Sequence, residues 1–181
     1  MSGDAAVASA LDFAQRSPET TRTRVLTWQD PLPAAAAGTQ LSGIEYMLAV
    51  LDGEIPPPPM AVTLRMAVVD VAEGEAIFEG LPGEEHYNPI GVVHGGYAAT
   101  LLDSALGCAV HTTLPAGVGY TTLSLEAKFV RPIGRDTGAV RAEGRVLHRG
   151  RRQATAEARL TASDSGKLLA HGTGTCLILG E

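Results

Sequence analysis

Residues 95–110 have the sequence GGYAATLLDSALGCAV, which is the one strongly apolar helix candidate in the chain. Its apolar side chains recur at intervals of three and four residues, which predicts an α-helix from Gly95 to about Val110. The apolar stripe is wide and contains Tyr97, Ala98, Leu101, Leu102, Ala105, Leu106, Ala109 and Val110. A helix with so broad an apolar surface is buried on most sides, so we expect the rest of the chain to enclose it.

The chain after this helix is typical of β-strands. Apolar and polar side chains alternate over 121–130, 139–147 and 153–162, and 168–179 is a further strand candidate. Alanines occupy most inward positions of 153–162, which suggests a sheet that lies close to the helix. Because short turns separate these segments, we expect the four strands to form an antiparallel meander.

The chain before the helix supplies further elements. Alternation over 62–68 and a short segment at 75–79 predict two more strands. Helical spacing over 44–51, with Ser42 and Glu45 in a capping-box pattern, predicts a helix that Gly53 ends, and prolines 56–59 predict an extended connector. The sum is an α+β architecture, in which one long buried helix packs on an antiparallel sheet of five or six strands.

The first 38 residues lack the regular apolar periodicity of the remainder. Prolines at positions 18, 31 and 33 interrupt any long element there, and 34–38 suggest a short helix or a linker. We therefore predict an N-terminal arm over 1–38 and one compact domain over 39–181. The arm is either mobile or packed on a partner chain.

Composition places the chain among globular proteins with a real core, because 45% of its 181 residues are hydrophobic and 19% are charged. The net charge of −6 argues against nucleic acid as the main partner. Two cysteines without a CxxC pattern give no disulfide framework, which fits a cytoplasmic protein. No apolar run approaches the roughly 20 residues of a membrane span, and residues 1–15 lack the features of a signal peptide, so we expect no membrane partner.

Asp103 is the one charged residue inside the apolar helix. No Lys or Arg lies three or four positions from it, so no ion pair forms along the helix. A buried carboxylate without a partner costs free energy, and such groups often serve as a base or a nucleophile. The alternatives are a thin polar face on the helix or a bond to a distant segment.

The start of the helix, His94-Gly95-Gly96, is the second candidate for chemistry. Glycines allow a ligand to approach the backbone closely. The first N–H groups of a helix have no internal partners and carry partial positive charge, so they can bind an oxyanion. The alternative is a glycine-rich helix start that binds no ligand.

Gly95 and Asp103 are eight residues apart, which is about 12 Å along a helix. One carbonyl group cannot contact both residues of the same helix. If both act on one substrate, two copies of the helix must lie side by side and antiparallel. We therefore expect a two-fold dimer with a shared site on each side.

The pattern Asn-Pro-x-Gly-x-x-His-Gly-Gly over 88–96, followed by Asp103, resembles the PaaI-type hotdog-fold acyl-CoA thioesterases of phenylacetic acid degradation. The similarity covers about residues 43–179. It implies a hotdog fold, in which a curved antiparallel sheet wraps a long central helix. It also implies an enzyme that hydrolyses acyl-CoA, and dimers that commonly pair into tetramers.

The resemblance further implies roles for individual residues. Asp103 would be the general base or nucleophile, and the backbone N–H of Gly95 would bind the thioester oxygen. Asn88 would position the thioester or the attacking water, and His94 would shape the helix start. A Ser or Thr early in the following strand would hold the water or the carboxylate, and Thr121 occupies that place.

Strand parity decides between two neighbouring threonines for that last role. Thr121 shares its face of the strand with Leu123 and Leu125, which we expect to point inward, whereas Thr122 points the other way. We therefore prefer Thr121.

Further residues are candidates for substrate binding. Gly96 and His86 are placed to line the site, and Arg131, Arg149 and Arg151 suit the phosphates of coenzyme A. The alternatives are a solvated loop histidine and an exposed hairpin end. The histidine spacing matches no metal motif, so we expect neither a metal nor a cofactor.

Two other functions stay open. An enoyl-thioester hydratase or dehydratase could use the same fold, although its usual acid/base motifs are not found here. A non-catalytic acyl-CoA-binding protein is the alternative outside the enzymes.

Overall fold

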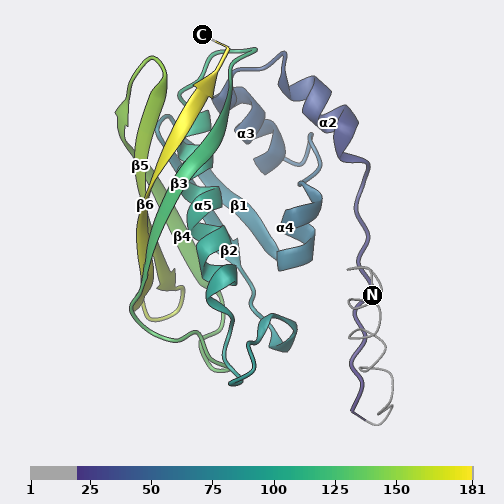
Figure 1. The fold of residues 1–181 in the computed structure, drawn as a ribbon. Coiled ribbons are helices and arrows are strands. Elements are labelled where there is room, and N and C mark those ends of the chain that lie inside the picture. Colours follow the sequence, from purple (N-terminus) through teal and green to yellow (C-terminus); the bar gives the residue numbers. More distant parts are fainter. Residues whose placement is uncertain (1–19, 181) are drawn as a thin grey trace, which may run out of the picture.

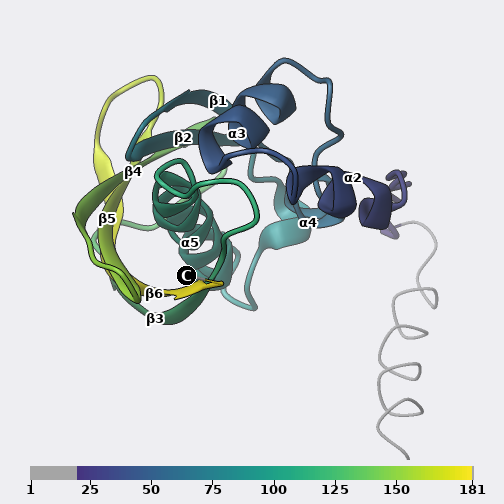
Figure 2. The same ribbon diagram turned by 90° about the horizontal axis from the view of Figure 1, so that it is seen from above.

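The computed structural model describes residues 20–180, which form a six-stranded antiparallel sheet around one long helix (Figure 1). That helix is α5 (Gly95–His111), as predicted. The strands are β1 (Met66–Ala72), β2 (Glu75–Gly80), β3 (Gly119–Phe129), β4 (Val140–Arg149), β5 (Gln153–Ala162) and β6 (Leu168–Leu179). Figure 2 shows how the sheet curves around α5. The predicted α+β architecture is confirmed.

Small residues let the sheet approach the helix, as the alanine pattern predicted. A Cβ at Gly144 of β4 would lie 2.2 Å from the backbone oxygen of Ala105 in α5, so only glycine fits there. The alanines of β5 at 154, 156 and 158 are buried against the same helix. The core therefore consists of the apolar stripe of α5 and the concave face of the sheet.

The predicted four-stranded meander is wrong in one position. The strand order is β1-β2-β4-β5-β6-β3, so β4, β5 and β6 form a meander but β3 pairs with β6 at the edge. To join β4, residues 130–139 cross three strand spacings, about 14 Å. That segment is too long for a tight hairpin turn but easily spans the distance. The outer edge of β3 has no strand partner among residues 20–180.

The predicted strand over 62–68 is half wrong. Residues Pro59–Leu64 form helix α4, and β1 begins only at Met66. Pro59 occupies the first turn of α4, where a missing N–H costs nothing. Arg65 ends the helix with a left-handed φ of 51°, which turns the chain into the strand. The proline connector is accordingly one residue shorter than predicted.

On the side of α5 that the sheet leaves open, α3 (Gly43–Leu51) lies next to α5 and α2 (Pro31–Gly38) lies farther out (Figure 2). Helix α3 has the predicted capping box, with the Ser42 N–H 2.8 Å from a Glu45 carboxylate oxygen. Helix α2 begins with Asp30 as its N-cap and has its two prolines in the first turn. A short 3-10 helix, η2 (Glu84–His86), leads into the loop before α5.

The predicted arm over 1–38 is described only in part. Residues 1–19 lie outside the described part of the chain, and α2 ends at the predicted boundary. The division into an arm and a domain at residue 38 stays a prediction. Within residues 20–180, no helix is both long and apolar enough to cross a membrane.

Candidate active site

The start of α5 leaves one backbone donor available. His94 is the N-cap residue, and its Nδ1 accepts a hydrogen bond of 2.9 Å from the Gly96 N–H. The N–H of Gly95 has no hydrogen-bond partner among the described residues. The helix dipole adds partial positive charge at this point. Gly95, rather than Gly96, is therefore the donor that can face an oxyanion.

Asn88 organises the loop that leads to this donor. Its side-chain oxygen accepts hydrogen bonds from the N–H groups of Ile90 (3.1 Å) and Val92 (3.3 Å). Gly91 completes the turn with a φ of 81°, a conformation that favours glycine. With its oxygen engaged, Asn88 can offer only its side-chain NH₂ group to a substrate.

A cavity of about 210 Å³ adjoins the start of α5. His94, Gly95, Phe129 and Arg131 are among the residues that line it. The Arg131 guanidinium donates a 2.7 Å hydrogen bond to the backbone oxygen of Leu168, which holds the side chain beside the cavity. A substrate at the Gly95 N–H would therefore lie close to one fixed positive charge.

The Asp103 carboxylate lies half-buried in the middle of α5, where it accepts a 3.0 Å hydrogen bond from the Thr122 hydroxyl. The strand parity that favoured Thr121 is therefore wrong. The pairing of β3 with β6 shifts register between Thr122 and Ser124, so Leu123 is an extra, bulged residue. The bulge reverses the faces, and Thr121 points outward.

The same bulge changes the exposure of the apolar side chains in β3. Leu123 was expected to point inward but is 52% exposed, and Phe129 at the end of the strand is 57% exposed. Leu125 and Ala127 remain packed against the core. Two exposed apolar side chains are therefore left on the edge strand, and one of them, Phe129, lies beside Gly95.

Gly95 and Asp103 lie in one continuous helix, so a single chain does not bring them together. Their separation along α5 is about 12 Å, as expected from the helical rise. The described chain therefore carries each half of the candidate site, one at the start of α5 and one at its middle.

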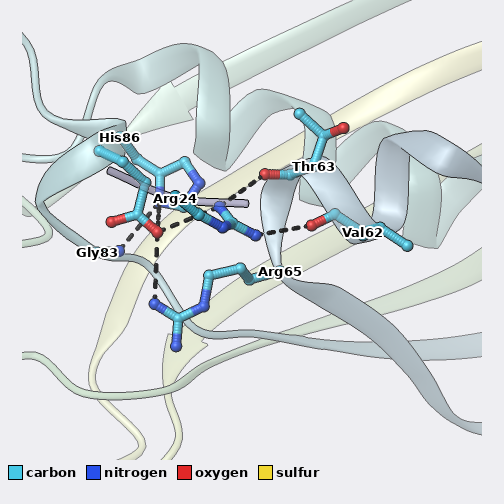
Figure 3. Close-up of polar contacts among 7 residues, drawn as sticks. Arg24, Val62, Thr63, Arg65, Gly83 and His86 are labelled. Carbon is cyan, nitrogen blue, oxygen red and sulfur yellow. Dashed lines mark hydrogen bonds and ion pairs between the residues drawn. The ribbon is translucent and has the colours of Figure 1, made fainter. Parts of the chain in front are cut away.

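The loop before α5 is anchored by a cluster of charged side chains from distant segments (Figure 3). Arg24 donates to the backbone oxygens of Val62 (2.9 Å) and Thr63 (3.1 Å), at the end of α4. It also contacts a Glu85 carboxylate oxygen at 3.2 Å, and Arg65 contacts the same oxygen at 3.4 Å. The Arg24 side chain thus links the end of α4 to η2.

His86 has its side chain buried beside the start of α5. Its side chain is only 7% exposed, and its Nδ1 accepts a 3.0 Å hydrogen bond from the Gly83 N–H. Its ring packs on the ring of Tyr97, with 4.7 Å between centroids. It does not line the cavity at the start of α5. The loop histidine is therefore part of the support of that helix start.

Arg149 and Arg151 lie at the other end of the sheet. Strand β4 begins at Val140, which pairs with Gly80 beside Tyr97, near the start of α5. It ends near the C-terminus of the helix, where the turn to β5 contains both arginines. Arg151 lines a surface cavity of about 520 Å³ together with His148 and Arg152. Within one chain, this turn is far from Gly95.

Cys108 is partly buried and packs against the core, and it does not have the properties of a nucleophile. Burial raises the pKa of its thiol to about 12. Its sulfur lies 3.9 Å from the Tyr120 hydroxyl. A thiol in this state supplies no thiolate near neutral pH.

Comparison with known proteins relates this chain to thioesterases. The family model described as Thioesterase superfamily matches residues 90–169. Human acyl-coenzyme A thioesterase 13 is 32% identical over 113 residues, which cover 61% of this chain and 78% of the human protein. The stretch that carries Gly95, Asp103 and Thr122 lies inside the matched family region.

Solved structures agree. A phenylacetic acid degradation-related protein from Ralstonia eutropha is 33% identical, with a TM-score of 0.66 over 73% of this chain and 98% of that chain. A variant of the phenylacetic acid degradation protein PaaI from Thermus thermophilus is 32% identical, with a TM-score of 0.60 over 66% of this chain and 98% of that chain.

Proposed function

This chain belongs to the thioesterase superfamily, as a PaaI-like thioester hydrolase with the hotdog fold, and on that basis we propose that it hydrolyses acyl-CoA to a free acid and CoA. The observation that carries the proposal is the Asp103 carboxylate, which the Thr122 hydroxyl holds on the side of α5 beside the edge strand β3. The free N–H of Gly95 supplies the second half of the site.

The proposed chemistry is acyl transfer to water. The Gly95 N–H binds the thioester oxygen, and this hydrogen bond strengthens as negative charge develops on that oxygen. Asp103 takes a proton from water while the water oxygen bonds to the carbonyl carbon. The carbon–sulfur bond then breaks, and the leaving thiolate is protonated. In the alternative route, Asp103 itself attacks and water hydrolyses the resulting anhydride.

The remaining candidates support these two groups. Asn88 offers its side-chain NH₂ to the thioester or the water, and His94 fixes the helix start through its bond to Gly96. Thr122 takes the positioning role first given to Thr121. Arg131 lines the cavity beside Gly95, where its positive charge suits an anionic group of the substrate such as a CoA phosphate.

We propose that the active unit is a two-fold dimer. Strand β3 is 11 residues long, lies at the edge of the sheet, and exposes Leu123 and Phe129. Unpaired edges of this kind are templates for pairing with another chain. A second copy of β3 would cover these apolar side chains and extend the sheet.

The dimer would also complete the site. Within one chain, Thr122 lies beside Asp103, and Phe129 lies beside Gly95. Antiparallel pairing of two β3 strands about an axis near residues 125 and 126 sets Thr122 opposite Phe129 of the partner subunit. Asp103 then faces Gly95 of the partner subunit. Arg149 and Arg151, at the far end of α5, then lie on the side of the partner's helix start. Pairing of two such dimers into a tetramer is a further prediction.

The cytoplasm is the proposed location. Both cysteines are free thiols in the structure, as in a reducing compartment.

The proposed activity is tested by thiol release from a panel of aryl-CoA and aliphatic acyl-CoA substrates, with water addition to crotonyl-CoA measured in parallel. We expect hydrolysis of several saturated acyl-CoAs and no hydration of crotonyl-CoA. Hydration without hydrolysis would favour a hydratase. Binding of acyl-CoA without either reaction would favour a sensor and would contradict the proposal.

Thr122→Val is expected to lower kcat about tenfold or more, because it removes a hydroxyl hydrogen bond to a charged carboxylate while keeping the side-chain volume. Thr121→Val is the matched control. It makes the same change one residue away on the exposed face, and we expect kcat within about twofold of wild type. Equal effects of the two variants would contradict the role given to Thr122.

A further inference from the structure

A second cavity lies beside the middle of α5 and has no role in the reaction described above. Its volume is about 290 Å³. Helix α3, the proline connector, α4, β1, β2 and α5 all contribute to its wall, and Tyr46, Met47, Val50, Ser104 and Cys108 are among the lining residues. Helices, the proline connector and two strands therefore surround this cavity.

No residue that lines this cavity carries a charge at neutral pH. The polar side chains are Tyr46, Ser104 and Cys108. Burial raises the pKa of Tyr46 above its usual value and that of Cys108 to about 12, so both stay neutral. A charged ligand would lose its hydration here without gaining an ionic partner. The lining suits an uncharged, apolar group.

The wall that α5 contributes to the cavity begins one residue after Asp103. Ser104 follows Asp103 in α5, and Cys108 lies one helical turn further along the same side. These positions, unlike Leu102 and Leu106, are not fully covered by the sheet. The cavity therefore lies along α5 next to the position of the proposed base.

We infer that this cavity binds the acyl group of the thioester, an inference that rests on the proposed acyl-CoA hydrolysis. With the thioester carbonyl at Asp103, the acyl chain enters past Ser104 and lies between α3, α4 and β1. An apolar protein cavity of about 150 Å³ holds benzene, so a space about twice that size accepts a medium-length alkyl chain or a phenyl-bearing group. Acyl groups that end in a carboxylate are excluded.

The side of the cavity that faces His111 sets an upper limit to the length of the acyl chain. A neighbouring cavity of about 350 Å³ lies toward His111 and shares Tyr46, Met47 and Cys108 with the first. These three side chains separate the two spaces. Acyl chains that fill the first cavity therefore meet them, and longer chains gain no further apolar contact.

Val50→Phe in the full-length protein tests this inference, because Val50 lines the cavity and is only partly buried. The measurement is kcat/KM for acetyl-, butanoyl-, octanoyl-, dodecanoyl-, phenylacetyl- and succinyl-CoA. For the wild type, we expect a gain of about fourfold for each methylene that enters the cavity. Succinyl-CoA should be at least about tenfold poorer than butanoyl-CoA, which has the same number of acyl carbons.

In Val50→Phe, the advantage of octanoyl-CoA over acetyl-CoA should fall at least about tenfold, while acetyl-CoA hydrolysis changes little. Val50→Ala, which is less disruptive to packing, should instead move the preference toward longer chains. Leu48→Phe is the matched control, since Leu48 is exposed on the same helix and does not line the cavity. It should keep the wild-type profile.

The outcomes separate the two proposals. Hydrolysis that requires Asp103 but shows the same chain-length profile in wild type, Val50→Phe and Val50→Ala would overturn the acyl-binding role of the cavity. A preference for succinyl-CoA over butanoyl-CoA would overturn it as well. Failure of the wild type to hydrolyse any acyl-CoA, or full activity of Asp103→Asn, would instead overturn the proposed function.

Discussion

Asp103→Asn is expected to fold like the wild type and to lose about 10³-fold in kcat. Asparagine has the same shape, and its side-chain oxygen can still accept the hydrogen bond of the Thr122 hydroxyl. It can neither take a proton from water nor attack a carbonyl carbon. The loss should therefore fall on kcat, with little change in the affinity for acyl-CoA.

Asp70→Asn is the matched control for this variant. Asp70 is an exposed aspartate on β1, at the opposite edge of the sheet from β3. Thiol release under saturating substrate gives kcat for both proteins, and thermal unfolding checks that both fold. Activity of Asp103→Asn within threefold of wild type would exclude Asp103 as base and as nucleophile.

Gly95→Pro is expected to lower kcat 10²–10³-fold, which is the usual effect of removing one oxyanion donor. Proline is well tolerated at the first position of a helix, because that N–H has no acceptor within the helix. The preceding residue, His94, has φ −60° and ψ 137°, a conformation compatible with a following proline. The substitution thus deletes one N–H and leaves the helix intact.

Gly95→Ala separates the loss of the N–H from the addition of a side chain. A Cβ at this position would lie 3.4 Å from the ring of Phe129, a contact that a small shift of an exposed ring accommodates. We expect Gly95→Ala to keep kcat within about tenfold of wild type. If alanine and proline reduce kcat equally, steric crowding explains the effect and the Gly95 N–H is not the oxyanion donor.

The sequence predicts the central helix and most strands because their apolar periodicity extends over many residues. The stripe from Tyr97 to Val110 has one consistent spacing, and a helix of that kind needs a sheet to cover it. The capping box at Ser42 and the glycine after α3 are local signals, and both are confirmed.

Other features depend on contacts that a single segment does not encode. The β-bulge at Leu123 arises where β3 pairs with β6. In the sequence, apolar and polar residues alternate through this position without interruption. The sequence alone therefore favours Thr121 over Thr122. Strand β3 lies at the edge of the sheet because β4 pairs with β2 and β5 rather than with β3. The sequence of these strands alone does not show that choice of partner. By contrast, Pro59 is a signal for the start of α4 that the sequence contains. The alternation of apolar and polar residues from 62 onward predicts a strand there instead.

In the proposed dimer, each active site combines Asp103 of one subunit with Gly95 of its partner. Hybrid dimers with differently tagged subunits, purified through both tags, test it most directly by thiol release. A hybrid of Asp103→Asn with Gly95→Pro should regain about half the wild-type activity, because one of its two sites contains both intact groups. A hybrid of wild type with the double variant should be nearly inactive, because each of its sites lacks one group. The reverse pattern, an inactive first hybrid and a half-active second one, would place both groups in the same chain and contradict the shared site.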